Sequence, residues 1–160
     1  MNATTVSPME HLCDLVRDID VVMLTTVDRN GRLHSRPTMT LRSAAEGALW
    51  FFTQACSHMV DDVQGHHPVN LSYVDSAKGT YVSVSGRARV IHDRARKSQL
   101  WERRLARWLP NGWDDDEVIL LRVEVQEAEY WSNGGQREFT AAIEVGVANG
   151  GVRNEKILFQ

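Results

Sequence analysis

Three short segments of the chain carry residue types that could bind a phosphorylated or aromatic ligand: residues 34–38, 51–59 and 129–131. In the second segment, Thr53 and Ser57 lie where an expected strand ends and an expected helix begins. Two hydroxyls could therefore lie beside backbone N–H groups that have no partner within the helix. This arrangement is typical of a phosphate site. Serine and threonine also cap helices, so capping is the alternative interpretation.

Arg36, in the first segment, could add the positive charge that a phosphate or an electron-rich ring attracts. An ion pair with a carboxylate is the alternative role for this arginine. Three of the five tryptophans, Trp101, Trp108 and Trp113, are close together in the sequence. They could line an aromatic pocket or a subunit contact, or they could pack in the core.

Several other kinds of chemistry lack their motifs. The six histidines include no H-x-x-x-H pair, and His66 and His67 are adjacent, so we expect no metal site. No G-x-S-x-G elbow is present, which disfavours a serine hydrolase, and no G-x-G-x-x-G follows an expected strand, which disfavours a dinucleotide fold. The acidic run at residues 114–116 is typical of a solvated turn.

Length, charge and cysteine content narrow the class of protein. The 160 residues contain 18 Lys and Arg against 21 Asp and Glu, a net charge of −3, so nucleic acid is not an expected partner. No run of about 18 apolar residues suits a membrane span. The first residues lack the pattern of a secretory signal, so we expect a cytoplasmic protein. Cys13 and Cys56 are expected to be buried and reduced.

Hydrophobic spacing predicts helices over residues 7–18 and 57–65, and a third from an N-cap at Asp93 to near Trp108. The first begins with the S-x-x-E pattern of a capping box. Strands are expected over residues 21–27, 32–41, 48–53, 69–74, 80–91, 118–125 and 128–131. The strand at 48–53 is apolar on both faces, which predicts a central position.

Turn signals join most of these strands as hairpins, and Gly86 inside the strand at 80–91 predicts a bulge or a bend. About six strands with short helices beside them predict a mainly β, α+β domain with a six-stranded antiparallel, barrel-like sheet. Residues 1–160 read as one domain. Beyond residue 135 we expect a weakly helical stretch to residue 147 and a short apolar end at residues 157–159.

The motifs, taken in order, resemble the general stress proteins among the pyridoxamine 5'-phosphate oxidase-like FMN-binding split barrels. The resemblance covers a core of about residues 8–135 and leaves a C-terminal extension at 136–160. The matching segments are residues 24–31, 35–37, 49–57, 69–73, 81–86, 108–112, 120–123 and 129–131, together with Trp101. The resemblance implies a six-stranded split β-barrel that forms a homodimer, with two FMN sites between the subunits.

The resemblance also assigns candidate cofactor residues. Arg36, Pro37 and Thr38 would run along the flavin ring, whereas Phe52, Thr53 and Ser57 would approach the ribityl chain and phosphate. Tyr81 and Trp131 of the partner subunit would close the site. Relatives usually have a basic residue two positions after the serine, but this chain reads Ser57-His58-Met59. Unless His58 or another cation substitutes, losing one charged hydrogen bond would weaken FMN binding by about one to two orders of magnitude.

True pyridoxamine phosphate oxidases carry an Arg-x-His-Asp-Arg segment after the tryptophan, and here only Arg137 has a counterpart. Oxidation of vitamin B6 is therefore not expected. The resemblance implies an FMN-dependent oxidoreductase acting on a small molecule, in which the cofactor does the chemistry and no side chain is assigned as catalytic. A non-enzymatic module that binds or sequesters flavin or another small ligand is the alternative. FAD, deazaflavin and haem are alternative cofactors.

Overall fold

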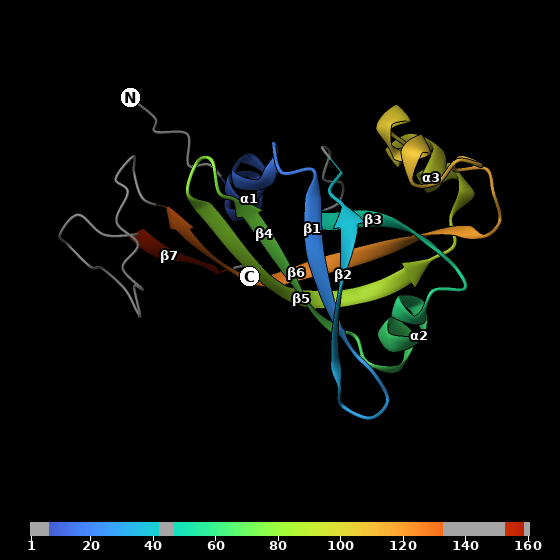
Figure 1. Ribbon diagram of the computed structural model, residues 1–160, viewed down its shortest axis with the longest axis horizontal. Coiled ribbons are helices and arrows are strands. Elements are labelled where there is room, and N and C mark those ends of the chain that lie inside the picture. The colour runs from blue at the N-terminus through green and yellow to red at the C-terminus, as the bar shows by residue number, and fades with distance from the viewer. Residues whose placement is uncertain (1–6, 42–46, 133–152, 159–160) are drawn as a thin grey trace.

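The computed structural model describes residues 7–41, 47–132 and 153–158 (Figure 1). This part of the chain contains seven strands, and their neighbours in the sheet are all antiparallel. The strand order is β2-β1-β4-β5-β6-β3, and β7 lies beside β6. The elements are α1 (Pro8–Val16), β1 (Val21–Val27), β2 (Leu33–Met39), β3 (Ala48–Gln54), α2 (His58–Gly65), β4 (Pro68–Asp75), β5 (Thr80–Ile91), α3 (Arg94–Leu100), the 3-10 helix η1 (Arg103–Arg107), β6 (Val118–Ser132) and β7 (Arg153–Leu158).

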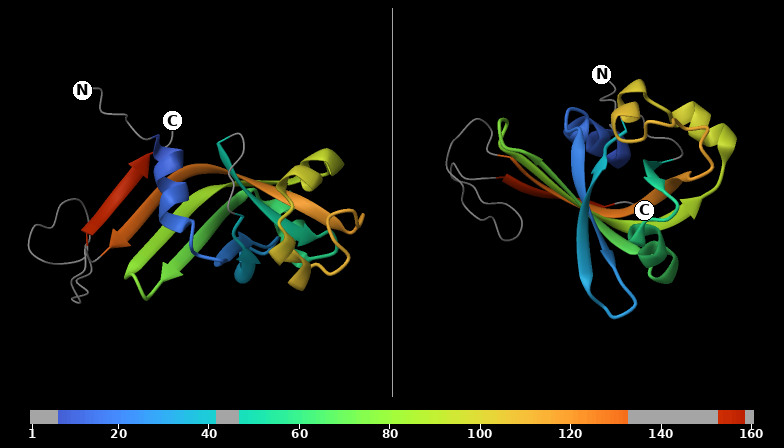
Figure 2. Two further views of the ribbon diagram at one scale, coloured as in Figure 1. Left: turned by 90° about the horizontal axis from the view of Figure 1, so that it is seen from above. Right: turned by 45° about the vertical axis from the view of Figure 1, so that its right-hand side comes forward.

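The first six strands form a curled half-barrel with helices beside it, which confirms the predicted α+β class. Because the sheet curls, β2 and β3 come into contact although they lie at opposite ends of the strand order (Figure 2). The long strands β5 and β6 pair along most of their length. On the other edge of β6, β3 pairs with residues 118–124 and β7 pairs with residues 127–132.

A bulge interrupts the β5–β6 ladder between Ser85 and Gly86, as the sequence predicts. Gly86 is required there because a Cβ on this residue would lie 2.4 Å from the carbonyl oxygen of Glu124. A bulge increases local twist, so this one fits the curl of the two longest strands. In the β1–β2 turn, Gly31 has the positive φ of 78° that the Asn-Gly signal predicts.

The apolar residues form two cores on opposite faces of the sheet. The larger core fills the concave side, where Leu24, Phe51 and Val123 from the strands pack with Leu12 of α1 and Val63 of α2. The smaller core lies between the outer face of β3 and β6 and the α3–η1 segment, and it contains Leu41, Ala48, Trp50, Phe52, Leu100, Leu105, Leu109, Val118 and Leu120.

The two cores correct the prediction that residues 48–53 form a central strand. In the described sheet, β3 is an edge strand that pairs with β6 alone. Its residues are nevertheless buried on both faces because Leu49 and Phe51 enter the larger core while Trp50 and Phe52 enter the smaller one. A covering segment hides an edge strand as effectively as neighbouring strands do.

The helices follow their capping signals, with one exception. At α1, Ser7 and Glu10 form the predicted capping box. Asp93 caps α3 through a 2.9 Å bond from the backbone N–H of Arg96. The predicted helix does not continue to Trp108, because Trp101 is extended (ψ 132°) and separates α3 from η1. The Trp101 ring packs edge-on against Phe52, with centroids 5.4 Å apart, at the edge of the smaller core.

The remaining predictions about structure concern the two cysteines and the C-terminal residues. Both cysteines are free, but Cys56 is exposed and Cys13 is only partly buried, so the prediction of two buried thiols is wrong. The turn that follows β3 leaves Cys56 outside the core. The weakly helical stretch expected up to residue 147 lies outside the described residues. Two residues of the expected apolar end, Ile157 and Leu158, belong to β7.

Candidate functional site

A groove of about 300 Å³ opens where the ends of β2 and β3 meet the α3–η1 segment. Its lining residues come from β2, from β3 and the start of α2, and from η1 and the residues after it. They are Pro37, Thr38, Met39, Phe52, Thr53, Gln54, Ser57, Met59, Leu105, Trp108 and Leu109. The volume is at the lower end of the range for small-molecule sites in proteins.

The curl of the sheet creates this groove. It brings β2 against β3, and a tight turn after β3 then leads directly into α2. Two backbone bonds fix the turn: the N–H of Ala55 donates to the carbonyl of Glu117 at 2.7 Å, and the N–H of Ser57 donates to the carbonyl of Gln54 at 3.1 Å. Ser57 is thereby held at the end of the groove, beside Thr53.

The hydroxyl of Ser57 does not cap α2. Ser57 has the extended backbone of an N-cap residue (φ −74°, ψ 142°), but its side chain makes no capping hydrogen bond. Its Oγ lies 3.4 Å from Thr53 Oγ1, in a weak contact between two groove-lining hydroxyls. Ser7 and Asp93 do cap α1 and α3, the other two α-helices of the described residues, whereas Ser57 leaves α2 without a side-chain cap. The first N–H groups of α2 and both hydroxyls could therefore bind a ligand.

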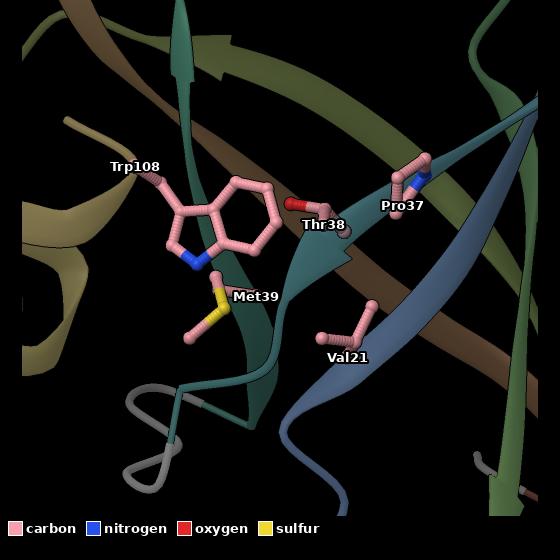
Figure 3. A pocket seen from close by; sticks show the side chains of 5 residues that line it. All are labelled: Val21, Pro37, Thr38, Met39 and Trp108. Atoms are coloured by element: carbon pink, nitrogen blue, oxygen red, sulfur yellow. The ribbon is translucent and has the colours of Figure 1, made fainter.

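Trp108 forms the opposite wall of the groove. It follows η1, and 55% of its surface is exposed. Figure 3 shows its indole beside Thr38 and Met39, with the Thr38 oxygen directed toward the ring. Pro37 and Val21 lie on the side of Thr38 away from the tryptophan. A large exposed aromatic ring at the mouth of a groove is suited to packing against a flat ligand.

Arg36 lies outside the groove and pairs with the neighbouring helix. Its Nη2 is 3.4 Å from Asp62 Oδ2, and its Nη1 donates to Thr26 Oγ1 at 3.2 Å. Thr26 Oγ1 also donates to Asp62 Oδ2 at 2.7 Å, and both Thr26 and Asp62 are buried. The ion pair considered as the alternative role of Arg36 is therefore present in the structure.

Of the residues that the resemblance assigns to the cofactor, the structure brings Pro37, Thr38, Phe52, Thr53, Ser57 and Met59 together in the groove. His58 is exposed at the start of α2, whereas Met59 is buried and packs in the larger core. Tyr81 and Trp131 lie opposite each other in the β5–β6 ladder, where β6 also pairs with β7, and neither residue lines the groove. Figure 1 shows β7 at the end of the sheet that is distant from α3.

The sequence reasoning missed Met39, Gln54, Leu105, Trp108 and Leu109 as lining residues. Trp108 had a signal, because it belongs to the group of tryptophans that could line a pocket. The spacing of Leu105 and Leu109 is that of any core residue, so nothing in the sequence distinguishes a groove wall from ordinary packing.

A family model described as pyridoxamine 5'-phosphate oxidase like matches residues 7–154 of the chain. The chain belongs to the pyridoxamine 5'-phosphate oxidase-like family. This confirms the resemblance drawn from the sequence motifs. In the described part of this pyridoxamine 5'-phosphate oxidase-like protein, no helix is long and apolar enough to span a bilayer.

Two solved structures share the fold of this family member. A Clostridium acetobutylicum protein related to general stress protein 26 is 25% identical, with a TM-score of 0.66, over 78% of this chain and 87% of that one. A general stress FMN/FAD binding protein from Xanthomonas citri is also 25% identical, with a TM-score of 0.66, over 88% of this chain and 97% of that one. Protein bli-3 of Neurospora crassa is 31% identical over 68% of this chain. The match spans only 56% of bli-3.

Proposed function

We propose that this family member binds FMN in the groove between β2, β3 and η1, as a homodimer, and that the complex acts as a flavin-dependent oxidoreductase on a small molecule. The observation that carries the proposal is the pair of hydroxyls at Thr53 and Ser57, which lie 3.4 Å apart and do not cap α2. They line a groove whose walls include Trp108, Phe52 and Pro37. Apolar and aromatic walls with a few convergent polar groups are typical of a cofactor site.

The groove residues fit a flavin in character. The flat ring would pack against Trp108, with Thr38 as a hydrogen-bonding neighbour and Pro37 beyond it. The ribityl chain would extend toward Thr53 and Ser57, where hydroxyls and the first N–H groups of α2 can bind polar groups. The Xanthomonas citri protein, described as binding FMN or FAD, supports a flavin as the ligand of this chain as well.

An apolar strip beside the groove supports the homodimer. On the outer face of β1, Val21 and Met23 are 43% and 40% exposed. They lie opposite Met39 and Pro37 of β2, and these two residues also line the groove. A second copy seated on this strip would deepen the groove, and its Tyr81 and Trp131 are the residues that we propose to close it. Exposed apolar strips of this kind are typical of subunit contacts.

A bound flavin would supply the hydride or electron transfer itself. The chain would hold the ring through Thr38, Pro37 and Trp108 and would exclude water with the apolar wall formed by Leu105 and Leu109. None of the described residues that line the groove is a carboxylate, histidine, cysteine or lysine, so proton transfer by a side chain forms no part of the proposal. Pyridoxamine phosphate oxidation is not proposed, because the phosphate-binding histidine and second arginine of those enzymes are missing.

The uncharged groove also favours a second candidate function. A protein that only stores or sequesters flavin needs the ring contacts but no proton donor, and the lining residues offer such contacts. Reduction of the bound flavin by NADH or NADPH, followed by passage of electrons to a quinone or nitro compound, would separate the oxidoreductase from this alternative. A complex that binds flavin but transfers no electrons would favour storage.

Titration of the purified protein with FMN tests the shared part of both candidates. We expect quenching of flavin fluorescence and a shift of the flavin absorption bands, with one flavin per chain at saturation. Thr38→Val should weaken binding by removing the hydroxyl beside the ring, whereas Thr80→Val, at the start of β5, serves as the matched control. Absence of any quenching at excess FMN or FAD would refute the proposal.

A further inference from the structure

The described residues that line the groove carry no charge. Within the described part of the chain, all of its lining residues are apolar, aromatic, hydroxyl-bearing or amide side chains. A site that recognises a phosphate strongly normally offers at least one lysine or arginine. Whether a cation lines the groove therefore affects how well the groove distinguishes phosphorylated from unphosphorylated flavins.

Among the described residues, two arginines on elements that border the groove are engaged elsewhere. Arg36 pairs with the buried carboxylate of Asp62 at 3.4 Å. Arg104 donates to the carbonyl of Thr40 and lies 2.9 Å from the carboxylate of Glu102. Moving Arg36 into the groove would leave the buried Asp62 carboxylate without its counter-charge, and moving Arg104 would remove a donor from the Thr40 carbonyl; both changes are costly.

Two further residues beside the groove could carry charge, His58 and Arg107. Each is adjacent in sequence to a lining residue, but both are exposed and neither lines the groove. Met59 does line it, and that side chain is 5% exposed and packed in the larger core. The position two residues after Ser57 is therefore occupied by an apolar side chain that the larger core holds in place.

In the described part of the chain, the groups left to bind a phosphate are the N-terminus of α2 and the hydroxyls of Thr53 and Ser57. A helix N-terminus improves the binding of an anion by up to about fivefold at an exposed site. A hydrogen bond from a cation contributes roughly tenfold to more than a hundredfold. A phosphate at this end of the groove therefore gains little beyond what the neutral ribityl hydroxyls gain.

The wall that a second copy would add does not supply a clear excess of positive charge. On β5 and β6, Tyr81 and Trp131 are followed on the same face by Ser83 and Glu129. The register pairs Ser83 with Glu129, so these described neighbours of Tyr81 and Trp131 add no positive charge.

We propose that the groove recognises the flavin ring and discriminates little between riboflavin and its phosphorylated forms. The ligand class is thus the isoalloxazine ring with a neutral polyol chain, with or without a terminal phosphate. This inference rests on the proposed flavin binding and specifies which part of the ligand provides the affinity.

Dissociation constants for riboflavin and FMN, measured by fluorescence quenching at low and high salt, test the inference. We expect the two constants to agree within about fivefold and the FMN constant to change little with salt. FMN binding that is more than tenfold tighter than riboflavin binding and weakens with salt would overturn the inference while leaving the proposed function intact. If neither flavin binds, the proposed function itself fails.

Added charge provides a second, independent test. Gln54 is exposed and lines the groove, so Gln54→Lys should tighten FMN binding about tenfold relative to riboflavin binding, and should make FMN binding sensitive to salt. Gln64→Lys adds the same charge at an exposed position on α2 outside this groove and should change neither constant. His58→Gln and Arg107→Gln should leave the ratio of the two constants unchanged. A fall in the FMN advantage in either variant would identify a phosphate-binding cation and overturn the inference.

Discussion

Arg36 of β2 and Asp62 of α2 form an ion pair, with Nη2 and Oδ2 3.4 Å apart, that links the sheet to the helix next to the groove. Thr26 of β1 joins them through its hydroxyl, which donates to Asp62 and accepts from Arg36. The pair connects the strand carrying Pro37 and Thr38 to the helix that begins after Ser57. Residues on both sides of the groove are thereby held in a fixed relationship.

Asp62→Asn should lower the free energy of unfolding by about 1–3 kcal/mol, because the partly buried guanidinium of Arg36 loses its counter-charge. The Arg36 side chain is 30% exposed, so the loss should fall below that for a fully buried pair. Asp18→Asn removes an exposed partner of Lys78 and should cost well under 1 kcal/mol. Equal losses in chemical denaturation would show that the Arg36–Asp62 pair is no more important than a surface pair.

Gly86→Ala should destabilise the fold by about 3 kcal/mol or prevent folding. The added Cβ would lie 2.4 Å from the carbonyl oxygen of Glu124, so the β5–β6 backbone would have to move apart at the bulge. Gly65→Ala is the matched control, because nothing lies within 4 Å of its Cβ position and its φ is not positive. We expect that variant to be neutral or slightly stabilised. Similar melting temperatures for the two variants would contradict this account of the bulge.

Stability should also depend on pH through the β1–β2 turn. The hydrogen bond to His34, and then the backbone N–H of Arg32, lower the pKa of Asp28 from 3.8 to about 2. Ionised Asp28 therefore stabilises the folded state above about pH 4, and this contribution is lost as the pH falls toward 2. The stability difference between the wild type and Asp28→Asn should shrink over the same range.

The contribution of His34 to this turn can be measured directly. In His34→Ala, the pKa of Asp28, followed by NMR of its carboxyl carbon, should rise toward 3.8 but remain below it, because the two backbone bonds to Asp28 remain. His66→Ala, an exposed histidine on another element, should leave the titration unchanged. An unchanged Asp28 titration in His34→Ala would exclude the side-chain bond as the main cause.

Two tryptophans should respond differently to replacement by alanine. Trp108 is 55% exposed and lines the groove, so Trp108→Ala should weaken flavin binding by about tenfold with little change in melting temperature. Trp101 packs edge-on against Phe52, so Trp101→Ala should mainly lower stability, by about 2–4 kcal/mol. Loss of stability without loss of affinity in Trp108→Ala would assign that residue to the core.

Features set by neighbouring residues could be predicted from the sequence, whereas those that depend on distant contacts could not. The capping box at Ser7, the positive φ at Gly31 and the bulge at Gly86 were all predictable, because each follows from local chemistry. The order of the motifs predicted the family and hence the half-barrel.

The position of β3 was predicted incorrectly. Burial of Trp50 and Phe52 by the α3–η1 segment looks in the sequence the same as burial by adjacent strands. The engagement of Arg36 with Asp62 was also not specified by spacing, because the two residues meet only when α2 packs against the sheet. Local pattern thus predicted Thr53 and Ser57 as candidate site residues, but tertiary contacts decide which neighbours line the groove with them.

The apolar strip on β1 provides the last prediction. Met23 is 40% exposed and lies opposite Pro37, which also lines the groove, so a charge at this position should affect subunit contact and ligand binding together. Met23→Lys should shift the protein from dimer to monomer in analytical ultracentrifugation and weaken FMN binding at least tenfold, because the partner's Tyr81 and Trp131 would no longer close the groove. Gln64→Lys adds the same charge away from the strip and should preserve both properties. A monomeric Met23→Lys protein with unchanged FMN affinity would place the whole binding site within a single chain, and an unchanged dimer would place the subunit contact on another face.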